Sequence, residues 1–211
     1  MEKRQKIFAI RCPKCDHHFE KTLPTAIFAH ANDDKKFSEN FGLLTCPSCG
    51  SEFILNYRFA YTDEIDEFMI VNDPEFVEKK ARLAFSTSLG FLDKARKDEL
   101  YKHKVRITYN YDQVREKIAI FKAGLDDRVV ELMKVFLLES EDFAYKADQI
   151  KSFTFTDDKS FALVTELNVG VKVDFSDFLY DTVKESYKDK LGKEISYMVD
   201  RPWALDFLSR K

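Results

Sequence analysis

Two Cys-Pro-x-Cys pairs constrain the fold of this chain more than any other feature. They contain all four cysteines of the sequence, which are Cys12, Cys15, Cys46 and Cys49. Two residues lie between the thiols of each pair, so one tight turn can direct both sulfur atoms at a common point. Four thiolates complete the tetrahedral shell of a structural zinc ion. The sequence therefore predicts one structural zinc site built from these cysteines.

The residues next to the cysteines favour the same turn twice. Pro13 and Pro47 set the backbone φ at the first corner of each turn. Gly50 follows the second pair and can adopt a positive φ, and Asp16, which tolerates that conformation better than most residues, holds the corresponding place after the first pair. We therefore expect two turns of one geometry.

Two histidines, His17 and His18, lie beside the first pair and could replace or support a metal ligand. Because four thiolates already complete the shell, the histidines are surplus. We expect them at the surface or behind the ligands.

Iron is the alternative to zinc. Two Cys-Pro-x-Cys turns also resemble rubredoxin, in which four thiolates hold iron for electron transfer. The aromatic core of rubredoxin includes a tryptophan, whereas the only tryptophan of this chain, Trp203, lies near its other end. Zinc is therefore the expected cofactor. Four thiolates leave no open position for water, so we expect a structural role for the metal rather than catalysis.

The hydropathy pattern changes after residue 72. Before it, short segments alternate apolar and polar residues with the period of two that half-buried strands require. Asp73 and Pro74 then provide a helix cap and a first helical residue. The predicted fold class is α+β. A zinc-ribbon-like antiparallel β unit in residues 1–72 is followed by a helical and antiparallel-sheet body in residues 73–211.

The expected elements follow from these patterns and from turn and cap residues. Strands are predicted at 5–11, 18–23, 42–45, 52–61, 65–71, 152–156, 161–167 and 171–175. Helices are predicted at 73–90, 112–122, 126–140 and 176–192, with a short one from Pro202 onward.

Composition excludes some classes of protein. The net charge of −3 argues against binding of nucleic acid over a whole face. No apolar run reaches the roughly 20 residues that a membrane-spanning helix needs. Free cysteines in metal-type spacing are typical of a reducing compartment, so we expect a cytoplasmic protein without membrane association. The 20 phenylalanines exceed what a ribbon can bury and indicate a second packed body.

One basic segment could contact phosphates locally. Its cationic residues are Lys94, Arg96, Lys97, Lys102, Lys104 and Arg106. A solvated connector between a helix and a strand explains the same residues, and we prefer that explanation to nucleic-acid contact.

An enzyme without a short motif is a further alternative. The sequence contains no phosphate loop, dinucleotide fingerprint or hydrolase motif. Asp126, Asp127 and Arg128 form the most concentrated charged group, and paired carboxylates can share a proton. An acidic pair also caps a helix, because the free amides of the first turn attract it, and we prefer the capping role.

Several segments together resemble the CpXC domain family. They are Cys-Pro-Lys-Cys at 12–15, Cys-Pro-Ser-Cys-Gly at 46–50, Phe-Ala-Tyr-Thr-Asp at 59–63, Phe-Met-Ile-Val at 68–71, Glu-Lys-Ile-Ala-Ile-Phe at 116–121 and Gly-Leu-Asp-Asp-Arg at 124–128. The resemblance spans roughly the first two thirds of the chain and implies a metal site of four cysteines. The preferred function is a metal-stabilised binding or interaction module rather than an enzyme. Its partner is unknown, and a protein is one possible partner.

Overall fold

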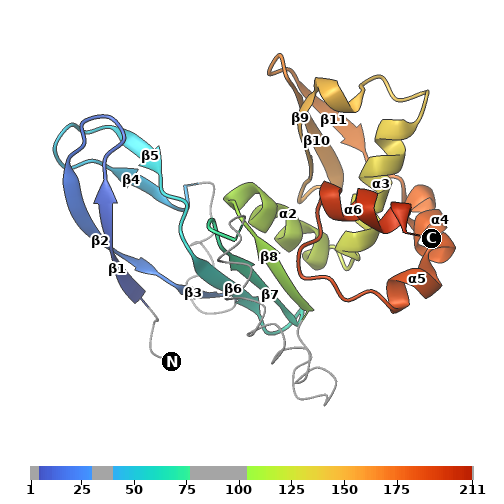
Figure 1. The fold of residues 1–211 in the computed structure, drawn as a ribbon, viewed down its shortest axis with the longest axis horizontal. Helices are drawn as coiled ribbons and strands as arrows, with labels where there is room; N and C mark the ends of the chain where they lie inside the picture. The colour runs from blue at the N-terminus through green and yellow to red at the C-terminus, as the bar shows by residue number, and fades with distance from the viewer. Residues whose placement is uncertain (1–4, 30–39, 77–103, 211) are drawn as a thin grey trace. The chain divides into compact units, whose positions relative to one another are not determined.

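The computed structural model describes residues 5–29, 40–76 and 104–210 (Figure 1). The chain divides into two compact units, Met1–Tyr111 and Asp112–Lys211. Strands dominate the first unit, and the second combines helices with an antiparallel sheet. The predicted α+β class, with its cysteines in an N-terminal ribbon-like β unit, is confirmed. None of the helices in the described ranges has the length and apolarity that crossing a bilayer requires.

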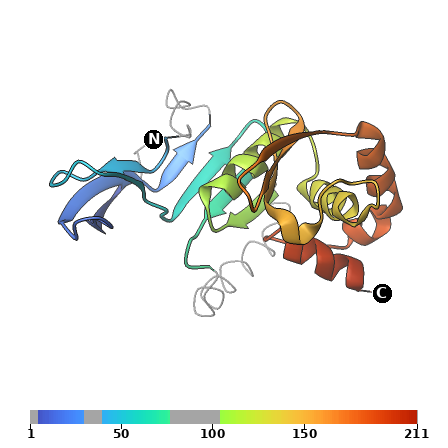
Figure 2. The same cartoon turned by 90° about the horizontal axis from the view of Figure 1, so that it is seen from above.

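The first unit contains two short hairpins and one larger sheet (Figures 1 and 2). Its strands are β1 (Gln5–Arg11), β2 (His18–Pro24), β3 (Ala26–Phe28), β4 (Leu43–Thr45), β5 (Glu52–Ile54), β6 (Phe59–Asp63), β7 (Phe68–Asn72) and β8 (Lys104–Thr108). The pairs β1–β2 and β4–β5 are antiparallel hairpins. The larger sheet has the order β3-β6-β7-β8, in which only β6 and β7 are antiparallel.

The predicted strand 52–61 is interrupted between β5 and β6. Side-chain hydrogen bonds replace strand pairing at the break. Asn56 donates from Nδ2 to the carbonyl of Tyr109 at 2.8 Å and accepts from Nδ2 of Asn72 at 2.9 Å. The chain thereby leaves the β4–β5 hairpin and enters the larger sheet.

The first unit ends at Tyr111 in the sequence, whereas the sequence pattern predicts a boundary near residue 72. The physical reason is the parallel pairing of β7 with β8, which joins residues 68–72 and 104–108 in one sheet. The predicted helix 73–90 lies largely outside the described residues. Four of the six basic residues, Lys94, Arg96, Lys97 and Lys102, lie wholly outside them. Of the remaining two, Lys104 is half-buried and Arg106 is buried in β8.

An aromatic cluster forms the core of the first unit. The ring centroids of Phe41 and Phe59 are 5.0 Å apart, those of Phe41 and Tyr111 are 5.4 Å apart, and those of Tyr57 and Phe59 are 5.5 Å apart. The Tyr111 hydroxyl donates a hydrogen bond to the carbonyl of Leu55. These contacts hold the irregular segment between β5 and β6 in place.

The second unit places a three-stranded antiparallel sheet of order β11-β10-β9 beside a set of helices. Its elements are α2 (Tyr111–Lys122), α3 (Asp127–Glu139), the 3-10 turn η2 (Ala147–Gln149), β9 (Ile150–Phe155), β10 (Ser160–Thr165), β11 (Gly170–Asp174), α4 (Asp177–Ser186), α5 (Lys188–Gly192) and α6 (Arg201–Ser209). Helix α3 packs against α4 and α6, and Phe155, Phe161, Leu163, Met133 and Phe207 are fully buried.

The predicted helix 176–192 is two helices in the structure. Ser176 caps α4 as its sequence suggests, because its hydroxyl accepts a hydrogen bond from the amide of Leu179. The helix then breaks at Tyr187, whose φ of −112° and ψ of 9° are not helical. The Tyr187 ring lies 6.0 Å from that of Phe136 and 5.9 Å from that of Phe207. Packing against these two rings therefore accompanies the break.

Gly42→Ala tests the aromatic core. Gly42 has a φ of +79°, and a Cβ atom there would lie 2.5 Å from Cε2 of Tyr111 and 3.0 Å from the carbonyl oxygen of Leu55. We expect the substitution to destabilise the first unit by about 2 to 4 kcal/mol, since backbone strain and overpacking add. Hydrogen exchange of the β6 and β7 amides measures the loss.

Gly124→Ala is the matched control, because Gly124 has a φ of +70° with open space around its Cα. It should lower protection in α2 and α3 by about 1 kcal/mol only. Equal losses in the two variants would show that the contact with Tyr111 does not matter.

Candidate metal centre

The cysteine pairs occupy the turns of the two hairpins. Cys12 and Cys15 follow β1 and precede β2, and Cys46 and Cys49 follow β4 and precede β5. These turns lie side by side at the end of the first unit in both ribbon views (Figures 1 and 2). Each strand pair thus brings two thiols to one end of a hairpin.

The two turns have the same backbone hydrogen bonds. In the first, the amide of Cys12 donates to the carbonyl of His17 at 2.9 Å, and the amide of Asp16 donates to the carbonyl of Cys12 at 3.0 Å. In the second, Cys46 donates to Ser51 at 2.9 Å, and the Gly50 amide donates to the Cys46 carbonyl at 3.0 Å. His17 and Ser51 therefore occupy equivalent positions.

Both turns also use a positive φ after the second cysteine. The angle is +59° at Asp16 and +68° at Gly50, as the sequence predicts. Asp16 is additionally held by the guanidinium of Arg11, whose Nε lies 3.0 Å from its Oδ1. A residue other than glycine can thus complete this turn.

The sulfur atoms converge on one point. All four lie within 4.8 Å of one another, and two of the distances between the turns are 3.8 Å from Cys12 to Cys49 and 3.7 Å from Cys15 to Cys46. A tetrahedron with metal–sulfur bonds of about 2.3 Å has edges of about 3.8 Å. The set of donors therefore fits a tetrahedral soft-metal ion, either zinc or iron.

Two of the four cysteines are buried and two are exposed to solvent. Cys12 and Cys46 are buried, with 0% and 1% of their surface exposed, whereas Cys15 and Cys49 are exposed. Each turn thus contributes one inner and one outer sulfur.

One side chain next to the thiols was not singled out by the sequence pattern. The hydroxyl of Ser51 lies 3.0 Å from the sulfur of Cys49 and 3.5 Å from that of Cys12. The only local sign of it is a hydroxyl-bearing residue two positions after the last cysteine. Ser51 therefore contacts sulfurs from both turns.

Ser51 also affects the acidity of the thiols when no cation is bound. Its hydrogen bonds lower the pKa of Cys12 to about 6 and lower that of Cys49. At Cys15 the amide of His17 lowers the pKa, but the Cys49 thiol and burial raise it to about 12 overall. A bound cation would hold all four as thiolates and remove this difference.

The two histidines stand outside the cluster of thiols, as expected. Both are exposed, and the His17 ring stacks on that of Phe19 with centroids 6.3 Å apart. Among the described residues, the group able to hold a metal ion contains cysteines alone.

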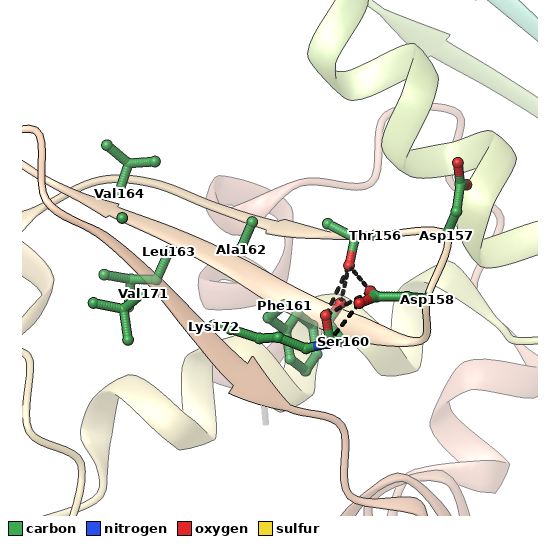
Figure 3. Close-up of a pocket in the computed structure, with 11 residues that line it drawn as sticks. Thr156, Asp157, Asp158, Ser160, Phe161, Ala162, Leu163, Val164, Val171 and Lys172 are labelled. Atoms are coloured by element: carbon green, nitrogen blue, oxygen red, sulfur yellow. Dashed lines mark hydrogen bonds and ion pairs between the residues drawn. The ribbon is translucent and has the colours of Figure 1, made fainter.

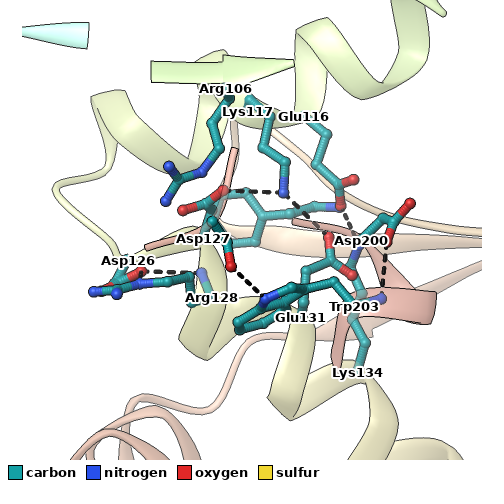
Figure 4. Close-up of polar contacts among 12 residues, drawn as sticks. Arg106, Glu116, Lys117, Asp126, Asp127, Arg128, Glu131, Lys134, Asp200 and Trp203 are labelled. Atoms are coloured by element: carbon teal, nitrogen blue, oxygen red, sulfur yellow. Dashed lines mark hydrogen bonds and ion pairs between the residues drawn. The ribbon is translucent and has the colours of Figure 1, made fainter. Parts of the chain in front are cut away.

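The acidic group at 126–128 has a structural arrangement. Asp126 caps α3, and its Oδ1 accepts from the amide of Arg128 at 3.0 Å while its Oδ2 pairs with Nη2 of Arg128 at 2.7 Å (Figure 4). Burial raises the pKa of Asp126, but the hydrogen bonds and charge of Arg128 outweigh it and hold that pKa below its usual value. The capping interpretation is confirmed.

The Arg128 guanidinium ties the start of α3 to the segment after α5. It donates to the carbonyls of Leu191 at 2.8 Å and Glu194 at 3.1 Å. Asp127 instead pairs with Lys117 at 3.2 Å. Asp126 and Arg128 therefore pair with each other, whereas Asp127 pairs with a lysine of α2.

A buried ion network connects α2 and α3 (Figure 4). Its members are Glu116, Lys117, Asp127, Glu131 and Lys134, each with at most 8% of its side chain exposed. Lys134 Nζ lies 2.5 Å from Glu116 and 3.0 Å from Glu131, and Glu116 also accepts from the amide of Phe155 at 2.7 Å. The network thus links both helices to β9.

Burial shifts the pKa values of the acidic and basic groups of this network in opposite directions. It raises the pKa of Glu116, which remains above its usual value despite the charge of Lys134. Burial lowers the pKa of Lys134, but the charges of Glu116 and Glu131 outweigh it and raise that pKa. This network was not predicted from the sequence, although Asp127, Glu131 and Lys134 recur at helical spacing on the apolar side of α3.

An open depression of about 560 Å³ lies on the sheet of the second unit, between β10 and β11 (Figure 3). Its polar groups satisfy one another. Asp158 accepts from the hydroxyls of Thr156 and Ser160 and from Nζ of Lys172, each at 2.6 Å. These bonds, with that to Lys172 the strongest cause, hold the pKa of Asp158 well below its usual value. These bonds stabilise the β9–β10 turn. The rest of the depression is lined mostly by Ala162 and neighbouring aliphatic side chains.

Lys134→Met tests the buried network. The substitution leaves Glu116 and Glu131 without the cation that both contact, so we expect a loss of about 3 to 5 kcal/mol in the unfolding free energy of the second unit. Fluorescence of Trp203, the only tryptophan, follows urea unfolding of this unit. The matched control Lys122→Met changes an exposed lysine of α2 and should cost under about 0.5 kcal/mol. Equal midpoints for the two variants would contradict a stabilising network.

Comparison with known proteins bears on the first unit and on the start of the second. No curated protein and no solved structure matches the chain. The family described as "CpXC protein" matches residues 10–134. The match contains both cysteine turns, the β6–β7 hairpin, the whole of α2 and the part of α3 that carries the buried network. Because it covers more than half of the 211 residues, the chain belongs to the CpXC family.

Proposed function

We propose that this protein is a zinc-stabilised binding module in which one zinc ion is held by the four cysteine thiolates. The observation that carries the proposal is the size of the sulfur cluster. The distances of 3.7 and 3.8 Å between the turns equal the edge of a zinc tetrathiolate, about 3.8 Å. Free thiols in this arrangement suit a reducing compartment such as the cytoplasm.

A structural role for the ion follows from the small size of the ribbon. Strands β4 and β5 have three residues each, and two-stranded hairpins are marginally stable in water. A zinc ion bound to both turns would crosslink the two hairpins, and structural zinc contributes an apparent 10 to 16 kcal/mol, roughly, at neutral pH. Four thiolates leave no position for a reacting water, so the ion would hold the fold rather than catalyse.

Exposed apolar side chains on the ribbon support a role in binding. Leu43 and Ile54 are direct cross-strand partners on β4 and β5, with 38% and 59% of their surface exposed. Ile7 on β1 is 60% exposed. Because Leu43 and Ile54 are neighbours, they form a contiguous exposed apolar pair, and contiguous apolar surface is typical of sites that contact another protein. A protein partner therefore fits this module better than a small substrate.

Metal analysis of the full chain tests the proposal. We expect one zinc per chain and no visible absorption, whereas a ferric tetrathiolate would be coloured and would support an electron carrier. Cys46→Ser should abolish stable zinc binding and remove amide protection from β1, β2, β4 and β5, because three thiolates no longer complete the shell. The fluorescence of Trp203 should remain that of a folded second unit.

His17→Ala is the matched control, because it changes a residue beside the cluster that is not one of the four thiols. It should retain one zinc per chain and full protection of the hairpins. A metal-free wild-type chain with protected hairpins would refute the structural role of zinc.

A further inference from the structure

The four cysteines of the cluster differ in their access to solvent. Cys12 and Cys46 are almost completely buried. Cys15 and Cys49 are exposed, and each is the second cysteine of its turn. Any chemistry with an external electrophile therefore begins at one of these two.

The backbone acts in the same direction on the two exposed cysteines. The backbone of His17 lowers the pKa of Cys15, and the backbone of Ser51 lowers the pKa of Cys49. Because the turns have matching geometry, these backbone groups are equivalent. The backbone by itself would give the two thiolates similar reactivity.

The side chains at the equivalent positions differ. The Ser51 hydroxyl lies 3.0 Å from the Cys49 sulfur, whereas the His17 ring stacks on Phe19. The hydroxyl has one proton, and its distance to Cys12 is longer, 3.5 Å, so Cys49 is the favoured acceptor. A hydrogen bond withdraws electron density from a thiolate and reduces its nucleophilicity.

We propose that Cys15 is the modification site of the zinc-loaded protein for soft carbon electrophiles, and that Ser51 is a positioning residue that sets this preference by protecting Cys49. The proposal rests on zinc binding by the four cysteines. In the reaction the zinc-bound sulfur of Cys15 forms a bond to the electrophilic carbon, and the leaving group departs with its electron pair. No proton is released, because the bound thiolate has none. The resulting thioether is a neutral and weaker ligand, so zinc is held by three thiolates and dissociates more readily.

The test uses the zinc-loaded full chain and a limiting amount of iodoacetamide, with iodide as the leaving group. Peptide mass spectrometry measures the rates at Cys15 and Cys49, and a chromophoric chelator measures released zinc. We expect Cys15 to react about threefold to tenfold faster, the range that one net hydrogen bond supports. Zinc release should follow the modification of Cys15.

Two substitutions at Ser51 distinguish the effect of its hydroxyl group from the effect of the shape of the turn. Ser51→Ala should raise the rate at Cys49 to that at Cys15, and Ser51→Thr, which keeps a hydroxyl, should restore the preference. His17→Ser places a hydroxyl at the equivalent position of the first turn and should slow Cys15. Zinc content is measured for every variant, so a variant that fails to fold is recognised, and the wild-type and His17→Ser rates still decide the question.

The outcomes distinguish this proposal from the one on which it rests. A wild-type chain without zinc would refute the metal site itself. A chain with one zinc in which Cys49 reacts as fast as Cys15 would overturn only the assignment of Cys15. Unequal rates that Ser51→Ala leaves unchanged would overturn the role of Ser51.

Discussion

A two-stranded hairpin buries too little apolar surface to be stable alone, and the first unit contains two of them. Their turns meet at four sulfur atoms, and the rings of Phe19 on β2 and Phe53 on β5 also contact one another, with centroids 6.4 Å apart. The rest of the unit depends on this meeting. The segment after β5 carries Tyr57 and Phe59 into the aromatic core, and β6 then begins the larger sheet. The segment that follows the second cysteine turn therefore leads through β5 into the aromatic core.

The second unit combines an apolar core with buried charged side chains. It has a large apolar core, so it can tolerate the buried charges of Glu116, Glu131 and Lys134. A buried ion pair is a weak source of stability, since desolvation offsets much of the Coulomb attraction, but it penalises every arrangement that separates the partners. The bond from the Phe155 amide to Glu116 extends this restriction to the sheet. We infer that the network selects how α2, α3 and β9 pack.

The family match crosses the division between these units. Residues 10–134 include the sulfur cluster of the first unit and all members of the buried network of the second. The sulfur cluster and the buried ion network thus both fall within the residues that the family model matches. The sheet of β9–β11 and the helices α4 to α6 follow it.

Local signals in the sequence determined the turn at each cysteine pair, the positive φ at Asp16 and Gly50, the helix caps at Asp126 and Ser176, and the end of α2 shortly before Gly124. Each depends on residues only a few positions apart, so a turn or cap motif contains all of the necessary information. Tertiary structure alone decided the meeting of the two cysteine turns, the parallel pairing of β7 with β8, the break between β5 and β6, the pairing of Lys134 with Glu116 and the contact of Ser51 with the sulfur of Cys12. In each of these cases the partner lies far away in the sequence, and the interaction exists only because packing of the whole unit brings that partner within reach.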